Sequence, residues 1–235
     1  MTDIIKVQKL KSDFVANVSH ELRTPLQSIK LGLETINNGH AAKDLESQKK
    51  ILPVVLQQTS RMENIVNDLL SLSRIELQEH IRPNEKVNLN DIISHSIELH
   101  QEILKKNNIE CQFERESKSV KINGDRNRLI EVFNNLIDNG IKYSEKNKKI
   151  TITTKSENKN FLVTIKDQGI GISKENIPQV TERFFRVDPA KSKEVGGTGL
   201  GLAIVKHIVN QHRAEMTISS EINKGTEISL NFPTT

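Results

Sequence analysis

The chain has 235 residues, of which 35% are apolar and 27% charged, and its net charge is +4. This composition is typical of a folded, rather polar protein with one large domain or two modest ones. The basic residues are spread among acidic ones, and the few aromatic residues do not interleave with them, so we expect no nucleic-acid partner.

Two further features concern the compartment. The single cysteine, Cys111, excludes an intramolecular disulfide and reads most simply as a small apolar residue in a strand. No apolar run approaches the ~20 residues that span a bilayer, and the N-terminus shows no signal-peptide pattern. We therefore expect these residues to be cytosolic.

The first helical pattern places a histidine beside a carboxylate. Apolar residues recur three or four apart from Phe14 to Ile36, and each residue turns a helix by about 100°. His20 therefore points away from the apolar face, with Glu21 next to it. A lone histidine on a helix is most often only solvated, so the pair needs support from the rest of the chain.

A second helical pattern follows a break at Asn37-Asn38-Gly39-His40, where Gly39 can end the first helix. Its spacing alternates between four and three, with one polar interruption, at Ile51, Val55, Gln58, Met62, Ile65, Leu69 and Leu72. A hairpin of two such helices leaves apolar surface uncovered, so we expect a dimeric four-helix bundle. Pro25 and Pro53 fall inside the patterns and are expected to bend or loosen the helices.

After residues 78–86 the pattern changes to mixed helix and strand. Helices are predicted over 90–100 and 125–143, capped by Asn90 and Asp125. Strands are predicted over 149–155, 161–166, 215–219 and 226–231. The glycine-bounded stretch from Asp167 to Thr198 is too long for an ordinary connection and reads as a lid over a binding site.

Three motifs in this second half suggest nucleotide chemistry. Asn135, Asn139, Lys142 and Tyr143 share one helix face, where amide oxygens suit Mg²⁺ and a lysine suits phosphate, although an ordinary polar face has the same spacing. Asp167 with Gly169 and Gly171 ends a strand, where a carboxylate can accept from an exocyclic amine and glycines admit a flat base; the same motif also fits a turn.

The third motif, Gly196-Gly197-Thr198-Gly199-Leu200-Gly201-Leu202, leads into a helical pattern, so its backbone N–H groups can meet a phosphate. No GKS or GKT follows it, which excludes a Walker loop. A Rossmann turn is also excluded, because the acidic residue expected ~20 positions later does not follow a second strand.

The order and spacing of these motifs resemble the cytoplasmic core of sensor histidine kinases over nearly the whole chain. The resemblance implies a linker from an upstream PAS sensor at 1–12, a dimerisation and histidine phosphotransfer domain at 13–80, and a catalytic ATP-binding domain at 86–235. Its fold class is a helical hairpin forming a dimeric four-helix bundle, followed by an α/β sandwich of the Bergerat (GHKL) type. Met1 would then be internal to a longer, membrane-anchored sensor. The lid segment has the sequence Thr181-Glu182-Arg183-Phe184-Phe185-Arg186-Val187-Asp188. Together with Ile204-Val205-Lys206-His207-Ile208-Val209, it is most similar to the phosphate-regulon members of the family.

The same resemblance assigns roles to residues. His20 would be phosphorylated, Glu21 would orient it and take its proton, and Thr24 would hold a water for dephosphorylation of the partner, unless it only bonds its own helix backbone. Asn139 would bind Mg²⁺ and Asp167 would read adenine. The remaining nucleotide contacts would be Asn135, Lys142, Tyr143, Gly169, Gly171, Arg186, Gly197, Thr198, Gly199, Leu200 and Gly201. The implied cosubstrate is ATP, and the implied partners are a second copy and an OmpR/PhoB-like response-regulator receiver domain.

Two alternatives remain open. An ATPase of the gyrase, Hsp90 and MutL type would carry a glutamate base one turn before the metal-binding asparagine, where this chain has Asn135. A non-catalytic dimer scaffold would not need Asn139, Asp167 and four motif glycines together. One departure from the family is Ala214, where many members have a glycine that ends the preceding helix.

Overall fold

The computed structural model describes residues 2–38, 44–117, 120–145, 147–188, 192 and 196–234, with side chains from residue 12 onward. The chain divides into two compact units. We call residues 1–70 with 192–198 the hairpin unit, and residues 71–191 with 199–235 the sheet unit.

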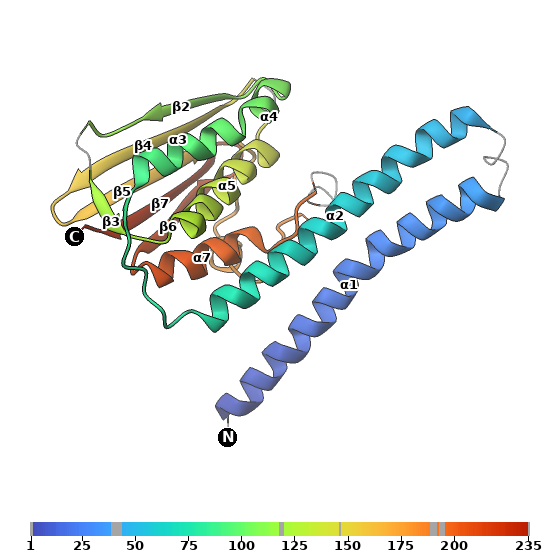
Figure 1. The fold of residues 1–235 in the computed structure, drawn as a ribbon, viewed down its shortest axis with the longest axis horizontal. Helices are drawn as coiled ribbons and strands as arrows, with labels where there is room; N and C mark the ends of the chain where they lie inside the picture. The colour runs from blue at the N-terminus through green and yellow to red at the C-terminus, as the bar shows by residue number, and fades with distance from the viewer. Residues whose placement is uncertain are drawn as a thin grey trace. The chain divides into compact units, whose positions relative to one another are not determined.

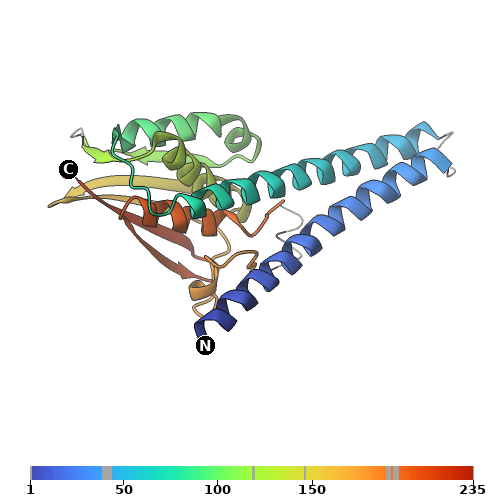
Figure 2. The ribbon, with the colours of Figure 1, turned by 60° about the horizontal axis from the view of Figure 1, so that its bottom comes forward.

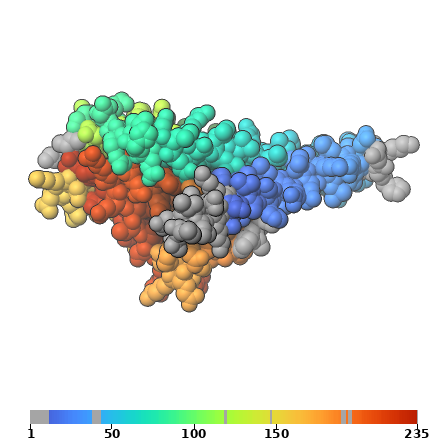
Figure 3. All heavy atoms as spheres, turned by 90° about the horizontal axis from the view of Figure 1, so that it is seen from below, coloured from blue at the N-terminus to red at the C-terminus, as the bar shows by residue number. Residues whose placement is uncertain are grey.

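The hairpin unit contains two long helices, α1 (Thr2–Asn38) and most of α2 (Leu45–Leu77), lying side by side (Figure 1). In the space-filling view the later part of α1 lies directly against the first part of α2 (Figure 3). Both helices continue through their prolines, Pro25 and Pro53. The expected turn at Gly39 lies outside the described residues.

In the hairpin unit, the predicted apolar residues of α2 are more completely buried than those of α1. Val55 and Ile65 of α2 are buried, and the other members of its predicted stripe are at least half-buried. On α1, Leu26 and Leu33 are about half exposed, whereas Pro25 is buried. The predicted face of α1 is therefore shared between a side that meets α2 and a side left in the open.

The sheet unit is built on a five-stranded sheet of order β2-β4-β5-β7-β6, in which β2 runs parallel to β4 and the other neighbours are antiparallel. A separate antiparallel pair is formed by β1 and β3. The strands are β1 (Lys86–Asn88), β2 (Glu110–Glu114), β3 (Lys121–Asn123), β4 (Lys149–Glu157), β5 (Asn160–Asp167), β6 (Glu215–Glu221) and β7 (Gly225–Pro233). The helices are α3 (Leu89–Leu99), α4 (Gln101–Lys106), α5 (Arg126–Tyr143), the short 3₁₀ helix η2 (Ile177–Gln179) and α7 (Gly201–Gln211).

The helices α3, α5 and α7 cover one face of this sheet (Figure 2). Alternate residues of β4 and β5, such as Ile150, Ile152 and Val163, are fully buried beneath them, while most of their neighbours are only partly buried. The matching core of α5 includes Val132 and Phe133. One covered face and one open face make this unit a two-layer α/β sandwich, as predicted.

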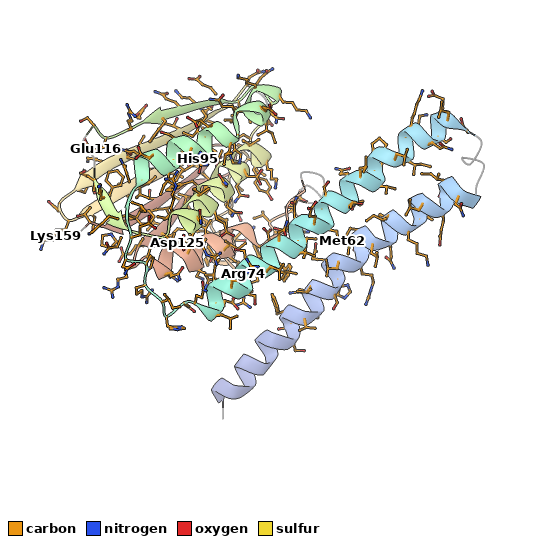
Figure 4. All side chains as sticks on the ribbon, in the orientation of Figure 1. Met62, Arg74, His95, Glu116, Asp125 and Lys159 are labelled. Carbon is orange, nitrogen blue, oxygen red and sulfur yellow. The ribbon has the colours of Figure 1, made fainter. Side chains whose placement is uncertain are left out.

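The predicted helices and strands of the sheet unit were confirmed, and one predicted helix cap was wrong. The four predicted strands and both predicted helices are present, and Asp125 (Figure 4) caps α5 by accepting from the N–H groups of Asn127 and Arg128. The predicted cap of α3 at Asn90 was wrong, because the side chain of Asn88 accepts from the N–H of Asn90. Asn90 is instead buried, where its amide donates to the carbonyl of Glu116.

Candidate active site

The candidate phosphoacceptor lies on the surface of α1. His20 is exposed, and the next residue, Glu21, is partly buried. The carboxylate of Glu21 pairs with the guanidinium of Arg61 on α2, at 3.2 Å between Oε2 and Nη2. The hydroxyl of Thr24 donates to the carbonyl of His20 at 3.3 Å, which is the backbone bond that the sequence left open for this residue. Exposure of His20 leaves its imidazole accessible to an incoming phosphoryl group.

Pro25 changes the hydrogen bonding of the same helix turn. A proline has no N–H, so the carbonyl of Glu21, four residues earlier, loses its usual intrahelical donor. Pro25 itself is buried, and the helix continues past it to Asn38. The turn after His20 is therefore held by packing of the proline ring rather than by a complete ladder of hydrogen bonds.

In the sheet unit, Asp167 forms the centre of a polar cluster at the end of β5. Its Oδ1 atom accepts from the N–H of Gly169 at 2.8 Å and from the N–H of Thr226 at 3.1 Å. Burial raises the pKa of Asp167, although these two hydrogen bonds act in the opposite direction. Its Oδ2 atom has no hydrogen-bond partner among the described residues, so this atom remains an acceptor for a ligand N–H.

The two glycines after Asp167 lie where the protein's own backbone comes close. A Cβ on Gly169 would lie 2.4 Å from the carbonyl oxygen of Tyr143, and one on Gly171 would lie 2.0 Å from that of Glu221. Gly171 also has a φ of +70°. Close approach of the protein's own backbone therefore requires glycine at both positions, and the contact of these glycines with a flat base stays a prediction.

The polar face of α5 borders the start of α7. The side-chain nitrogen of Asn135 donates to the carbonyl of Glu131 at 2.9 Å, and its Oδ1 atom lies 2.6 Å from where a Cβ on Gly201 would be. Lys142 pairs with Asp138 at 2.6 Å, one turn earlier on the same helix. The half-buried amide of Asn139 has no hydrogen-bond partner within the described part of the chain.

The glycine-rich loop divides between the two units. In the sheet unit, the N–H of Phe184 donates to the carbonyl of Gly199 at 2.7 Å, which ties the lid segment that contains Arg186 to the loop. Leu200 is buried, and α7 begins directly after it without a side-chain cap from this residue. In the hairpin unit, the N–H of Gly197 donates to the carbonyl of Ser192.

Thr198 also falls in the hairpin unit. Its hydroxyl donates to a carboxylate oxygen of Asp68 at 2.7 Å. The predicted phosphate contact is thus engaged by an acidic side chain of α2 in this structure. Lid residues 189–191 and 193–195 lie outside the described residues.

The structure therefore brings together two groups of predicted residues within the sheet unit. One group is Asn135, Gly201 and the lid, and the other is Asp167, Gly169 and Tyr143.

Two residues that contribute to the candidate site were not predicted from the sequence. Thr226 reaches Asp167 through its backbone N–H, which no side-chain pattern reveals. Arg61 was overlooked because a single arginine in an apolar helical stripe reads as an ordinary surface residue, yet its side chain is only 8% exposed.

Comparison with known proteins identifies both parts. Residues 10–78 match the His Kinase A (phospho-acceptor) domain, and residues 124–235 match the histidine kinase-, DNA gyrase B-, and HSP90-like ATPase family. The chain therefore belongs to the sensor histidine kinase family.

Individual relatives extend the likeness along the whole chain. The Phosphate regulon sensor protein PhoR of Pseudomonas aeruginosa is 34% identical over 99% of this chain, which covers 52% of that protein. The Sensor protein kinase WalK of Staphylococcus saprophyticus is 36% identical over 99% of this chain, which covers 38% of that protein. The chain thus spans about half or less of these relatives. The histidine kinase ThkA, solved in complex with the response regulator protein TrrA, has a TM-score of 0.76 at 25% identity, covering 98% of this chain and 64% of that one. No described helix combines the length and apolar character that crossing a membrane would require.

Proposed function

We propose that this protein is an ATP-dependent protein-histidine kinase that phosphorylates itself on His20. One observation carries the proposal: a single chain presents an exposed His20-Glu21 pair on a helix of a phospho-acceptor domain, and an ATPase-family domain whose Asp167 keeps a carboxylate oxygen available. These are the acceptor and the nucleotide reader that such a reaction requires.

The reaction can be written in terms of these residues. A nitrogen of the His20 imidazole attacks the γ-phosphorus of ATP, the bond to the bridging oxygen of ADP breaks, and Glu21 accepts the proton released from the ring. Asp167 accepts from the exocyclic amine of adenine, while Lys142, Tyr143, Arg186 and the first N–H groups of α7 neutralise and orient the phosphates.

Asn139 would hold Mg²⁺ together with phosphate oxygens. Its half-buried amide, which has no other partner in the described structure, fits this ligand. When bound, Mg²⁺ supplies neutralisation of the charge that develops on the transferred phosphoryl group. Asn135, one turn earlier, would support the same face.

The direct test is incubation with γ-labelled ATP and Mg²⁺. We expect label that is base-stable and acid-labile, as a phosphohistidine is, and its loss in His20→Gln. His80→Gln is the matched control, since His80 is also exposed and follows a glutamate. Label that persists in His20→Gln would contradict the proposal. Phosphate release without a labelled protein would indicate the ATPase alternative, and no nucleotide use at all would indicate the scaffold.

For the partner, we propose an aspartate on an OmpR/PhoB-like receiver domain, which the complex of the relative ThkA with a response regulator supports. We also propose that the protein removes that phosphate, with Thr24 holding the attacking water. In a Thr24→Ala variant, autophosphorylation should persist while dephosphorylation of the regulator slows. Equal dephosphorylation by both proteins would leave Thr24 with only its bond to the His20 carbonyl.

For the assembly, we propose a homodimer formed by the hairpin unit. Val15, Leu26 and Leu33 are half exposed or more and lie within about 20° of one another around α1. Leu52, Leu56, Val66 and Leu70 form a similar exposed row on α2. A second hairpin would cover both rows and complete a four-helix bundle.

For the signal, we propose a response to phosphate starvation, which the likeness to PhoR and the sequence of the lid segment support. The comparable identity to WalK makes a different signal the alternative. Because ATP and receiver domains are found in the cytoplasm, we place these residues there, as the module of a membrane-anchored sensor. Deleting the gene should abolish induction of phosphate-scavenging enzymes on phosphate limitation; unchanged induction would contradict this assignment.

A further inference from the structure

The ion pair between Arg61 and Glu21 differs from the other described pairs of the hairpin unit. The side chains of Arg61 and Glu21 are 8% and 22% exposed, and the pair joins α2 to α1. The pairs Lys30–Glu34 and Lys49–Glu46 each lie within one helix, and all four of their side chains are more than half exposed. Such surface pairs contribute little, whereas a shielded pair is sensitive to the loss of either partner.

Burying the Arg61 guanidinium costs free energy unless an anion pairs with it. It lies on the inner face of α2 between Gln58 and Ile65, at a place in the stripe where an apolar residue would pack without desolvating a charge. A guanidinium taken out of water requires a well-placed anion, and the carboxylate of Glu21 provides one at 3.2 Å. The pair in turn restricts a flexible glutamate side chain that directly follows His20.

We infer that Arg61 is a positioning residue for the phosphorylation of His20, acting through Glu21. This inference rests on the proposed kinase function. Arg61 holds the Glu21 carboxylate on the α2 side of the helix, so that its approach to the imidazole ring is fixed before ATP arrives. A proton acceptor placed in advance avoids an ordering step in each turnover, and small misplacements of such groups cost large factors in rate.

The variant that tests this is Arg61→Met, which keeps an unbranched, flexible side chain that can pack on the inner face of α2 and removes the charge. We expect the kcat of autophosphorylation to fall by roughly 10- to 100-fold, while the KM for ATP stays within about twofold. Arg61→Lys keeps a charge without the planar fork and should recover part of the rate. Arg74→Met is the control, because Arg74 is an exposed arginine of the same helix, and its rate should match the wild type.

A double-mutant cycle separates positioning from a merely structural role. If Arg61 acts through Glu21, the Glu21→Gln/Arg61→Met pair should be no slower than Glu21→Gln alone. Dephosphorylation of the regulator, which depends on Thr24 rather than Glu21, should persist in Arg61→Met. Independent, multiplicative losses in the double variant, or equal losses in both activities, would overturn the inference.

The remaining outcomes are also decisive. Wild-type kcat in Arg61→Met would overturn the inference while leaving the kinase proposal intact, and absence of His20 phosphorylation in the wild type would overturn the kinase proposal itself. If Arg61→Met fails to fold, as judged by circular dichroism, Arg61→Gln provides the neutral variant, and the same cycle with Glu21→Gln applies.

Discussion

Asp167 shows how one side chain can favour ligand binding at the expense of folding. Its Oδ1 atom is occupied by two backbone N–H groups, and burial raises its pKa above the ordinary value of 3.8. A raised pKa for an acid means that the protonated form is favoured by folding, so this contribution to stability is lost as pH rises through the folded-state pKa. Near neutral pH the protein therefore carries a partly buried charge that folding alone would not select.

The substitution Asp167→Asn should separate these two effects. Asparagine keeps an oxygen that accepts from Gly169 and Thr226 but presents an NH₂ group where adenine would need an acceptor. We expect ATP affinity to fall by about 10- to 100-fold, measured by calorimetry, with an unchanged or higher free energy of unfolding in urea at pH 7. A parallel loss of stability would show that the charge itself is structural.

His212, which is 4% exposed, predicts a pH dependence of stability. Its Nδ1 atom lies 2.7 Å from the carbonyl of Ile208, and its Nε2 atom accepts from the N–H of Asp125, so the neutral tautomer with the proton on Nδ1 satisfies both. Burial lowers its pKa from the ordinary 6.5. The unfolded chain therefore takes up this proton at a higher pH than the folded chain, and stability should decline as pH falls below about 6.5.

The measurement is urea unfolding of the wild type and His212→Gln from pH 8 to pH 5. The advantage of the wild type should be greatest above pH 6.5 and should shrink as pH falls. A difference between the two proteins that is independent of pH would mean that the pKa of His212 is the same in the folded and unfolded states.

Arg213 shows how α7 ends although the chain has Ala214 where many family members have a helix-ending glycine. Arg213 has a φ of +56° directly after the helix, so the left-handed residue is Arg213 rather than Ala214, and Ala214 begins the buried approach to β6. A non-glycine residue in this region costs about 1 kcal/mol. Arg213→Gly should therefore raise the free energy of unfolding by about that amount, whereas Arg213→Val should lower it; a decrease for glycine would mean that the arginine side chain stabilises the turn.

At the scale of elements, periodicity was enough where an element buries one face. The helix over 126–143 and strands β4, β5, β6 and β7 were predicted because their apolar residues recur at the period of a half-buried element. Strands β1 and β3 have three residues each, too few to show any period. The cap of α3 was misplaced by two residues because Asn88 and Asn90 are equally good caps, and only the buried network around Asn90 decides between them.

The candidate site was predictable to the extent that it consists of local motifs. Asp167 and the two glycines that follow it were identified together, but their close contacts with the backbone of Tyr143 and Glu221 could not be predicted, because these segments come close only after the sheet forms. The donation from Thr226 to Asp167 depends on the pairing of β5 with β7, and the contact of Arg61 depends on the register of α1 against α2. The register between two distant elements cannot be predicted from the sequence of either segment alone.

These loop contacts predict unequal effects for two similar glycines. Gly171→Ala adds both a left-handed strain and a methyl group 2.0 Å from the carbonyl oxygen of Glu221, and should cost more than ~2 kcal/mol. Gly196→Ala has the same strain at φ +74° but nothing within 4 Å of the new methyl, and should cost ~1 kcal/mol. Thermal unfolding of both variants is the measurement, and equal losses would show that the contact with Glu221 relaxes freely.

At the scale of the whole molecule, the proposed reaction needs groups from both units. His20 belongs to the hairpin unit, whereas Asn139 and Asp167 belong to the sheet unit. Phosphoryl transfer requires contact between donor and acceptor, so the two units must come together during the reaction, within one chain or between the chains of a dimer. The proposed dimer therefore bears on how phosphoryl transfer occurs as well as on the architecture.

The exposed apolar rows of the hairpin predict where that dimer can be broken. Leu33 on α1 and Leu56 on α2 lie on these rows, and a glutamate at either would bury an unpaired charge in the bundle. We expect Leu33→Glu and Leu56→Glu to be monomeric by light scattering, with ATP binding retained because the nucleotide residues of the sheet unit are untouched. Leu31→Glu is the matched control: Leu31 is 66% exposed but lies about 160° around α1 from Val15, so this variant should remain a dimer.

Asn139→Asp should also remain a dimer while losing affinity for Mg-ATP. Dimeric Leu33→Glu and Leu56→Glu proteins would place the interface elsewhere, and a monomeric Asn139→Asp protein would show that nucleotide binding and assembly are not independent.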